Sequence, residues 1–163
     1  MTLLLDTSLW IDFTRACSPA PLKQFIAPFL LDPEAHLAEP VRFELLRSAR
    51  PDETRQLEAQ FATLPTLPTP ADLWQRAIDL GQACRQIGRT VLSLELLVAA
   101  VAVHHNAVLV SFDTDFEAIA AVSELRLQRL ERPVGTAAAG GGAGGDPLPD
   151  GGRPLGGAGG VPW

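Results

Sequence analysis

The chain has 163 residues, of which 47% are hydrophobic, and it carries a formal net charge of −6. This apolar content excludes a largely disordered chain, and the acidic balance argues against a broad basic surface for nucleic acid. The two cysteines, Cys17 and Cys84, lack the paired spacing of a zinc site, and no apolar run is long enough to span a membrane. We therefore expect a cytoplasmic protein without a membrane segment.

The composition changes abruptly after Arg132. Residues 133–163 consist mostly of Gly, Ala and Pro, with segments such as GTAAAGGGAGGD and GGRPLGGAGG. Such a segment offers no apolar face to bury, so we predict a flexible tail there. Residues 1–132 are then expected to form one folded domain, which is long enough for a single hydrophobic core.

The first half of this domain alternates short apolar runs with amphipathic stretches. Residues 2–5 predict a buried strand, and Asp6 follows with N-cap chemistry for a helix that continues through Phe13. The other expected elements of this half are a helix from Pro19, a strand over residues 35–39, a helix from Pro40 to about Ala49, a helix from Pro51 through Phe61, and a short strand near residues 64–67.

The second half continues the alternation. The pattern predicts a long helix from Pro70 to Gly88, a helix capped by Ser93, a continuous apolar strand over residues 107–112, a short helix over residues 116–122 and a last strand over residues 125–130. Strands that are apolar throughout are typical of a parallel sheet buried on both faces. The expected fold class is therefore α/β, a three-layer arrangement in which helices flank a short parallel sheet on both faces.

Carboxylates recur beside these apolar runs, in four separate segments. Asp6 ends the first strand and Asp113, with Asp115 close by, follows the strand over residues 107–112, while Glu44 and Glu95 are expected in first turns of helices. The carboxyl ends of parallel strands share one edge of the sheet, where ligands bind. An oxygen-only set of ligands favours Mg²⁺ or Mn²⁺, and such an ion can activate water against a phosphate ester.

Each acid also has a local explanation. Asp6, Asp113 and Asp115 could serve only as helix caps, Glu95 could complete a cap near Ser93, and Glu44 could pair with Arg47 one turn on. These explanations are independent of one another, whereas one shared metal site accounts for all the acids together. Three further basic side chains near Glu44 could contact phosphate or form a solvated face; they are Arg42, Arg47 and Arg50.

Four sequence blocks carry a resemblance to a known family. They are LLLDTSLWIDF, VRFELLRSAR, GRTVLSLELLVAAVAV and AVLVSFDTDFEAI. In this order and spacing they resemble the motifs of PIN-domain ribonucleases, and most closely the VapC toxin branch of bacterial type II toxin–antitoxin systems. The resemblance covers about residues 1–130. In that family the third block normally carries an aspartate, and here Glu95 stands in its place.

The resemblance implies a Mg²⁺-dependent endoribonuclease toxin that cleaves RNA phosphodiester bonds, with Mn²⁺ as a possible substitute. It also implies a homodimer and a cognate antitoxin protein. The matching positions imply that Asp6, Glu44, Glu95 and Asp113 are catalytic. They also imply that Asp6, Glu95, Asp113 and Asp115 bind metal, with Ser8 as a polar contact near Asp6.

Glu95 motivates an alternative of another class, a catalytically impaired PIN scaffold that binds RNA or an antitoxin-like partner. The glutamate side chain is one methylene longer than aspartate, and a displacement of about one ångström matters at a catalytic centre. A phosphatase that uses Asp6 as nucleophile is a third possibility. It is disfavoured because no second aspartate follows at the spacing DxD and no lysine stands in the later segments. The folded part also lacks a glycine-rich phosphate loop, which disfavours a nucleotide-hydrolysing enzyme.

Overall fold

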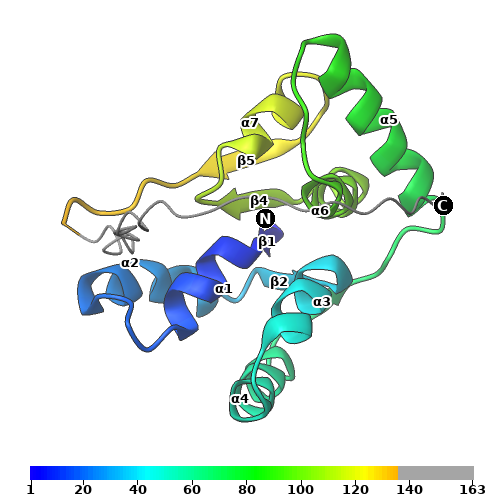
Figure 1. Cartoon of the computed structure of the whole chain (residues 1–163). Coiled ribbons are helices and arrows are strands. Elements are labelled where there is room, and N and C mark those ends of the chain that lie inside the picture. Colours follow the sequence, from blue (N-terminus) through cyan, green and yellow to red (C-terminus); the bar gives the residue numbers. More distant parts are fainter. Residues whose placement is uncertain (136–163) are drawn as a thin grey trace, which may run out of the picture.

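The computed structural model describes residues 1–135, so the predicted tail, apart from its first three residues, lies outside the described residues. Strands and helices alternate along the chain as the sequence predicts (Figure 1). In chain order they are β1 (Leu3–Leu5), α1 (Thr7–Thr14), α2 (Ala20–Leu30), β2 (Ala35–Ala38), α3 (Glu39–Ser48), α4 (Pro51–Phe61), β3 (Thr66–Leu67), α5 (Leu73–Gln86), α6 (Ser93–His104), β4 (Val108–Ser111), α7 (Asp115–Ala120) and β5 (Arg126–Arg129).

The five strands form one parallel sheet in the order β3-β2-β1-β4-β5. The chain first adds strands on one side of β1 and then crosses over to add β4 and β5 on the other side. The order therefore reverses between β1 and β4, which pair directly with Leu5 opposite Val110. Ligands of open parallel sheets bind at such a reversal, beyond the carboxyl ends of the strands.

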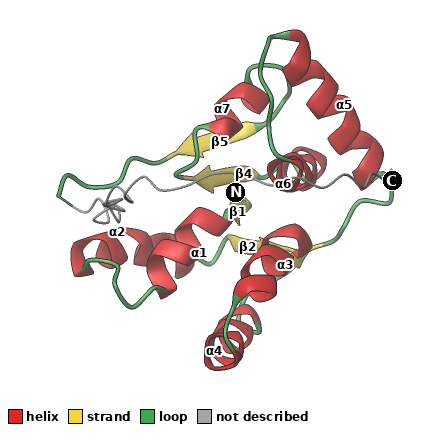
Figure 2. Cartoon of the chain, in the orientation of Figure 1, coloured by secondary structure: helices red, strands yellow, loops and turns green. Residues whose placement is uncertain are grey.

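The helices cover both faces of the sheet, so the predicted α/β three-layer fold is confirmed. Crossovers between parallel strands are right-handed, and the direction in which the strands are added places α1 to α4 on one face and α5 to α7 on the other. The contacts agree: α1 packs on α2 and α3, while α5, α6 and α7 pack on one another. Figure 2 shows α1 to α4 on one side of β4 and β5, with α5 and α7 on the other.

Two predicted helix starts are wrong. The fifth helix begins at Leu73 rather than at Pro70, with Asp72 at its N-cap position and the Asp72 carboxylate accepting a hydrogen bond from Arg76 Nε at 2.8 Å. Leu92, not Ser93, occupies the N-cap position of α6, and no side chain caps that helix. The side chain at the N-cap thus accepts no hydrogen bond from the first turn of α6, which carries Glu95.

The core lies between β1, β4 and the helix layers. Leu4, Leu5, Leu109 and Val110 are fully buried, and so is nearly the whole apolar run of α6 over residues 98–102. On the other face Trp10 packs edge-on against Phe61, with ring centroids 5.2 Å apart. This packing fixes the ends of β1 and β4 relative to each other. No helix within residues 1–135 combines the length and the apolar character needed to cross a membrane.

Candidate active site

Asp6 follows β1 directly and caps α1. One of its carboxylate oxygens, Oδ2, accepts three hydrogen bonds: from the Ser8 backbone N–H at 3.2 Å, from Ser8 Oγ at 2.7 Å and from Ser111 Oγ at 2.7 Å. No residue of the described chain donates to the other oxygen, Oδ1. Asp6 therefore acts as a helix cap and at the same time keeps one oxygen available for a ligand.

The two serine hydroxyls have their directions fixed by backbone donors. Ser8 Oγ accepts the Phe112 N–H at 3.1 Å, and Ser111 Oγ accepts the Asp113 N–H at 2.9 Å. A hydroxyl has one proton and two lone pairs. Each serine therefore donates a hydrogen bond to Asp6 and accepts one from a backbone N–H of the loop after β4. The network joins the ends of β1 and β4 across the point where the strand order reverses.

Ser111 is a site residue that sequence reasoning missed. It is the last residue of β4 and is completely buried. A signal was present, because a serine that ends a continuous apolar strand must find a hydrogen-bond partner inside the protein. That signal does not specify the partner, and the partner here is Asp6, 105 residues away in the chain.

Asp113 and Asp115 lie just beyond β4. Asp113 Oδ1 accepts the backbone N–H of Asp115 at 2.9 Å, and Asp115 stands in the first turn of α7. Thr114, not Asp113, occupies the N-cap position of α7, so this contact is a local turn just before the helix. None of the described residues donates to the carboxylate of Asp115, which is available for a ligand.

Glu44 lies in the middle of α3 and not, as predicted, in the first turn of a helix; the acid in the first turn of α3 is Glu39. Its expected partner Arg47 forms no ion pair with any residue of the described chain. Instead Thr7 Oγ1 donates a short hydrogen bond of 2.6 Å to Glu44 Oε2. Because Thr7 is the neighbour of Asp6, this contact attaches α3 to the end of β1.

The predicted basic edge is largely engaged by nearby acids. Arg42 lies 3.9 Å from Glu39 and 4.0 Å from Glu58, measured between the charged groups, and Arg50 pairs with Glu53 at 2.9 Å. Of the three arginines near Glu44, only Arg47 is left as an uncompensated cation in the described chain.

Glu95 stands in the first turn of α6 and is half-buried. Burial raises the pKa of its carboxyl, a hydrogen bond from its own backbone lowers it, and the carboxylates of Asp113, Glu44 and Asp6 raise it further. Its Oε2 atom is buried and has no hydrogen-bond partner. The acids from α3, α6 and the ends of β1 and β4 are thus close enough to influence one another electrostatically.

The carboxylate oxygens of these acids are the ligands that a hard divalent cation prefers, although their side chains are not arranged around a common point. Within residues 1–135, no three His, Cys, Asp or Glu side chains are already arranged so that they could hold a metal ion. The site nevertheless has the features that such an ion would satisfy. Asp6 Oδ1 is unengaged, Glu95 Oε2 is buried without a partner, and the carboxylates repel one another without a nearby cation.

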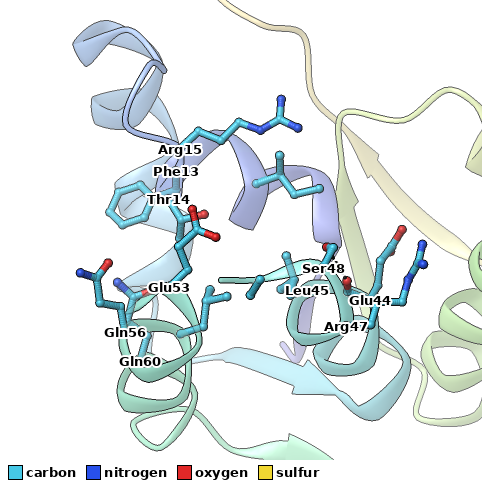
Figure 3. A pocket seen from close by; sticks show the side chains of 13 residues that line it. Phe13, Thr14, Arg15, Glu44, Leu45, Arg47, Ser48, Glu53, Gln56 and Gln60 are labelled. Carbon is cyan, nitrogen blue, oxygen red and sulfur yellow. Dashed lines mark hydrogen bonds between the residues drawn. The ribbon is translucent and has the colours of Figure 1, made fainter. Parts of the chain in front are cut away.

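A groove of about 600 Å³ opens beside Glu44, between α1, α3 and α4. Apolar side chains such as Ile11, Leu45 and Leu57 line it together with polar and charged ones. Glu44 and Arg47 line it from α3, and Gln56 and Gln60 line it from α4, on the opposite side of the view in Figure 3. Glu44 is the one member of the five predicted acids that lines this groove, so the groove adjoins the carboxylate cluster and is not centred on it.

Comparison with known proteins shows what the chain resembles. Residues 3–122 match the model of the PIN domain. Ribonuclease VapC11 of Mycobacterium tuberculosis is 33% identical over 129 residues, covering 76% of this chain and 96% of the relative. Among solved structures, VapBC-1 from nontypeable Haemophilus influenzae superimposes with a TM-score of 0.61 at 20% identity, covering 79% of this chain and 98% of that one. VapC20 of M. tuberculosis, described as a sarcin-ricin loop cleaving toxin, gives 0.55 at 22% identity, with 77% and 99% covered.

Proposed function

This chain belongs to the PIN-domain family, and we propose that it is a divalent-metal-dependent endoribonuclease, the toxin of a type II toxin–antitoxin pair. One observation carries the proposal: Ser111 at the end of β4 is hydrogen-bonded to Asp6, and Glu44 is hydrogen-bonded to Thr7 beside Asp6, in a cluster close enough to Glu95 to raise its pKa. Four acids from distant segments therefore converge at the carboxyl edge of a parallel sheet. The relatives' description as ribonucleases supports RNA as the substrate.

We assign the metal ligands to Asp6, Glu95, Asp113 and Asp115, with Mg²⁺ as the ion and Mn²⁺ as a substitute. All four offer carboxylate oxygens, which these ions prefer over nitrogen or sulfur ligands. When bound, the ion supplies Lewis-acid stabilisation of the phosphodiester and activation of water. The unengaged Asp6 Oδ1 and the partnerless Glu95 Oε2 are the atoms in the described chain that support this assignment most directly.

The other residues of the site have roles in orientation and proton transfer. Thr7 holds Glu44 Oε2 at 2.6 Å, so Oε1 is the oxygen that can accept a proton from the attacking water. Arg47 lines the groove beside Glu44 and has no acidic partner in the described chain, which makes it the candidate contact for an RNA phosphate. Ser8 and Ser111 keep Asp6 in one orientation.

The partners of the proposed toxin are a cognate antitoxin and a second copy of the chain. Solved structures with this fold include the VapBC pairs of H. influenzae and of Rickettsia felis, the latter bound to a promoter DNA fragment. These neighbours support an antitoxin partner for this chain. The homodimer and the cytoplasmic location remain predictions from the sequence.

The experiment that tests this function is RNA cleavage by the purified full chain with Mg²⁺ or Mn²⁺. We expect cleavage by the wild type, loss of cleavage on addition of a chelator, and none above background by Asp6→Ala. Asp79→Ala is the matched control, because Asp79 is an aspartate on α5 whose carboxylate accepts a hydrogen bond from Gln75 at 2.8 Å, outside the site. A wild type that cleaves no RNA, or undiminished cleavage by Asp6→Ala, would refute the proposal.

A catalytically impaired scaffold that binds RNA or an antitoxin-like partner is the second candidate. It is favoured by the glutamate at position 95, whose buried Oε2 has no hydrogen-bond partner in the described chain. Glu95→Asp separates the two candidates. A large gain in cleavage would mean that the natural protein is impaired, whereas unchanged or reduced cleavage would mean that the longer side chain is competent.

A further inference from the structure

Thr7 occupies an unusual position for a threonine in the first turn of a helix. It is buried, with only 4% of its surface exposed, and it lies between Asp6 and Ser8. Its hydroxyl does not bond to the backbone of its own helix. It donates instead to Glu44 Oε2 at 2.6 Å, across the packing interface of α1 and α3.

The contact is short and charge-assisted. A hydroxyl that donates to an ionised carboxylate makes a hydrogen bond roughly twice as strong as one between neutral groups. Thr7 is β-branched, so few side-chain rotamers are open to it in a helix, and the direction of its hydroxyl is correspondingly restricted. The donor is therefore rigid, whereas the glutamate that it holds has a long and flexible side chain.

Nothing else in the described chain orients the Glu44 carboxylate. Its anticipated partner Arg47 does not reach it, and no other side chain or backbone group donates to either oxygen. With Oε2 taken by Thr7, the remaining oxygen is the one free to face the acids of β1, β4 and α6. The effect of Glu44 on the pKa of Glu95 indicates that its charge is close to that cluster.

We propose that Thr7 is a positioning residue that fixes Glu44 in the reactive orientation. The inference rests on the proposed function and adds a residue to it. It makes the tripeptide of Asp6, Thr7 and Ser8 a single unit: Asp6 supplies a ligand, Ser8 orients that ligand, and Thr7 orients the acid of the neighbouring helix.

The test replaces Thr7 by valine, which keeps the shape of the side chain and removes the hydroxyl. Outer-shell partners of this kind are worth about 10- to 100-fold in metal affinity or activity, and we expect Thr7→Val to lower kcat for RNA cleavage about tenfold at unchanged KM. We also expect Mn²⁺ binding, measured by calorimetry on the full chain, to weaken by several-fold, because the Glu44 carboxylate, although not a ligand, lies close enough to the acids of the site to attract the cation. Thr7→Ser restores the hydroxyl and should recover most of both losses.

Two further variants separate positioning from a general loss of structure. Thr63→Val makes the same chemical change where the hydroxyl donates to a backbone carbonyl, that of Gln60, at 2.7 Å, and it should change neither kcat nor Mn²⁺ affinity. In a Glu44→Ala background the effect of Thr7→Val on Mn²⁺ affinity should vanish, because the two side chains then share no interaction.

The outcomes also distinguish this inference from the function on which it rests. If the wild type cleaves RNA and Thr7→Val matches it in kcat and Mn²⁺ affinity, the role of Thr7 is wrong and the proposed function stands. A lowered unfolding midpoint with unchanged kcat assigns Thr7 a purely structural role and overturns the inference. A wild type that neither binds Mn²⁺ nor cleaves RNA overturns both.

Discussion

The end of β1 and the start of α6 present their carboxylates in opposite states. Asp6 has one oxygen saturated by three donors from Ser8 and Ser111. Glu95 has a buried oxygen without any donor and a pKa raised first by burial and then by the neighbouring acids. The protein itself supplies hydrogen-bond donors to the Asp6 carboxylate and supplies none to the buried oxygen of Glu95.

This difference shows how one part of the site can be rigid while another part responds to metal and to pH. The junction of β1 and β4 is held by internal hydrogen bonds, so its geometry does not depend on a ligand. The first turn of α6 carries a charge that only a cation or a proton can compensate. The two regions are therefore expected to respond differently to mutation, pH and metal.

The largest expected effect is common to both regions. Replacing either charge, in Asp6→Asn or Glu95→Gln, should lower RNA cleavage by more than about 100-fold, because even the outer partners of metal ligands contribute about 10- to 100-fold. Initial rates at several Mg²⁺ concentrations measure the effect, with Asp79→Asn as the control. If Glu95→Gln kept full activity, Glu95 would have no place in the metal site.

Stability should separate the two regions. Asp6→Ala removes the acceptor of three hydrogen bonds and leaves the buried Ser111 hydroxyl only the more distant Ser8 Oγ, 3.3 Å away. A poorly satisfied buried group costs roughly 1–3 kcal/mol. Glu95→Gln removes a repelled charge and should leave the metal-free protein as stable as the wild type or more so. Denaturant unfolding in a chelator measures both. Equal destabilisation by the two variants would remove the contrast between the regions.

The smallest expected effect is on the pH dependence of stability. The pKa of Glu95 in the folded protein is raised above the unfolded value of about 4.3. The folded state therefore keeps this proton to a higher pH than the unfolded state does. The metal-free wild type should lose stability relative to Glu95→Gln as pH rises from about 4.3 through the raised pKa, and the difference should then stay constant. Parallel profiles for the two proteins would contradict the raised pKa.

Much of the fold can be predicted from the sequence because its strands are apolar throughout. Runs such as LLL and VLV leave few structures open other than a buried parallel sheet, and this places Asp6 and Asp113 at one edge. The starts of α5 and α6 were predicted wrongly for a physical reason. Proline and serine are favourable at several positions near a helix start, and the packing of the helix decides which of them is used.

The orientation of the side chains in the site depends on tertiary contacts, which a local sequence pattern does not reveal. Glu44 lies beyond the first turn of α3 because the helix begins at Glu39, and its partner is Thr7 rather than the arginine one turn away. The role of Ser111 could not be predicted, because one small polar residue in a buried apolar strand does not indicate which group it bonds to. The assignment of catalytic and metal-binding roles to the acids remains a prediction.

Calorimetric titration of the full chain with Mn²⁺ tests the central claim most directly, that the distant carboxylates form one metal centre. We expect saturable binding by the wild type, loss of that binding in Asp6→Asn, marked weakening in Glu95→Gln, and wild-type affinity in Asp79→Asn. Equal Mn²⁺ affinity in all four proteins, or no binding by the wild type, would contradict a metal centre built from these acids.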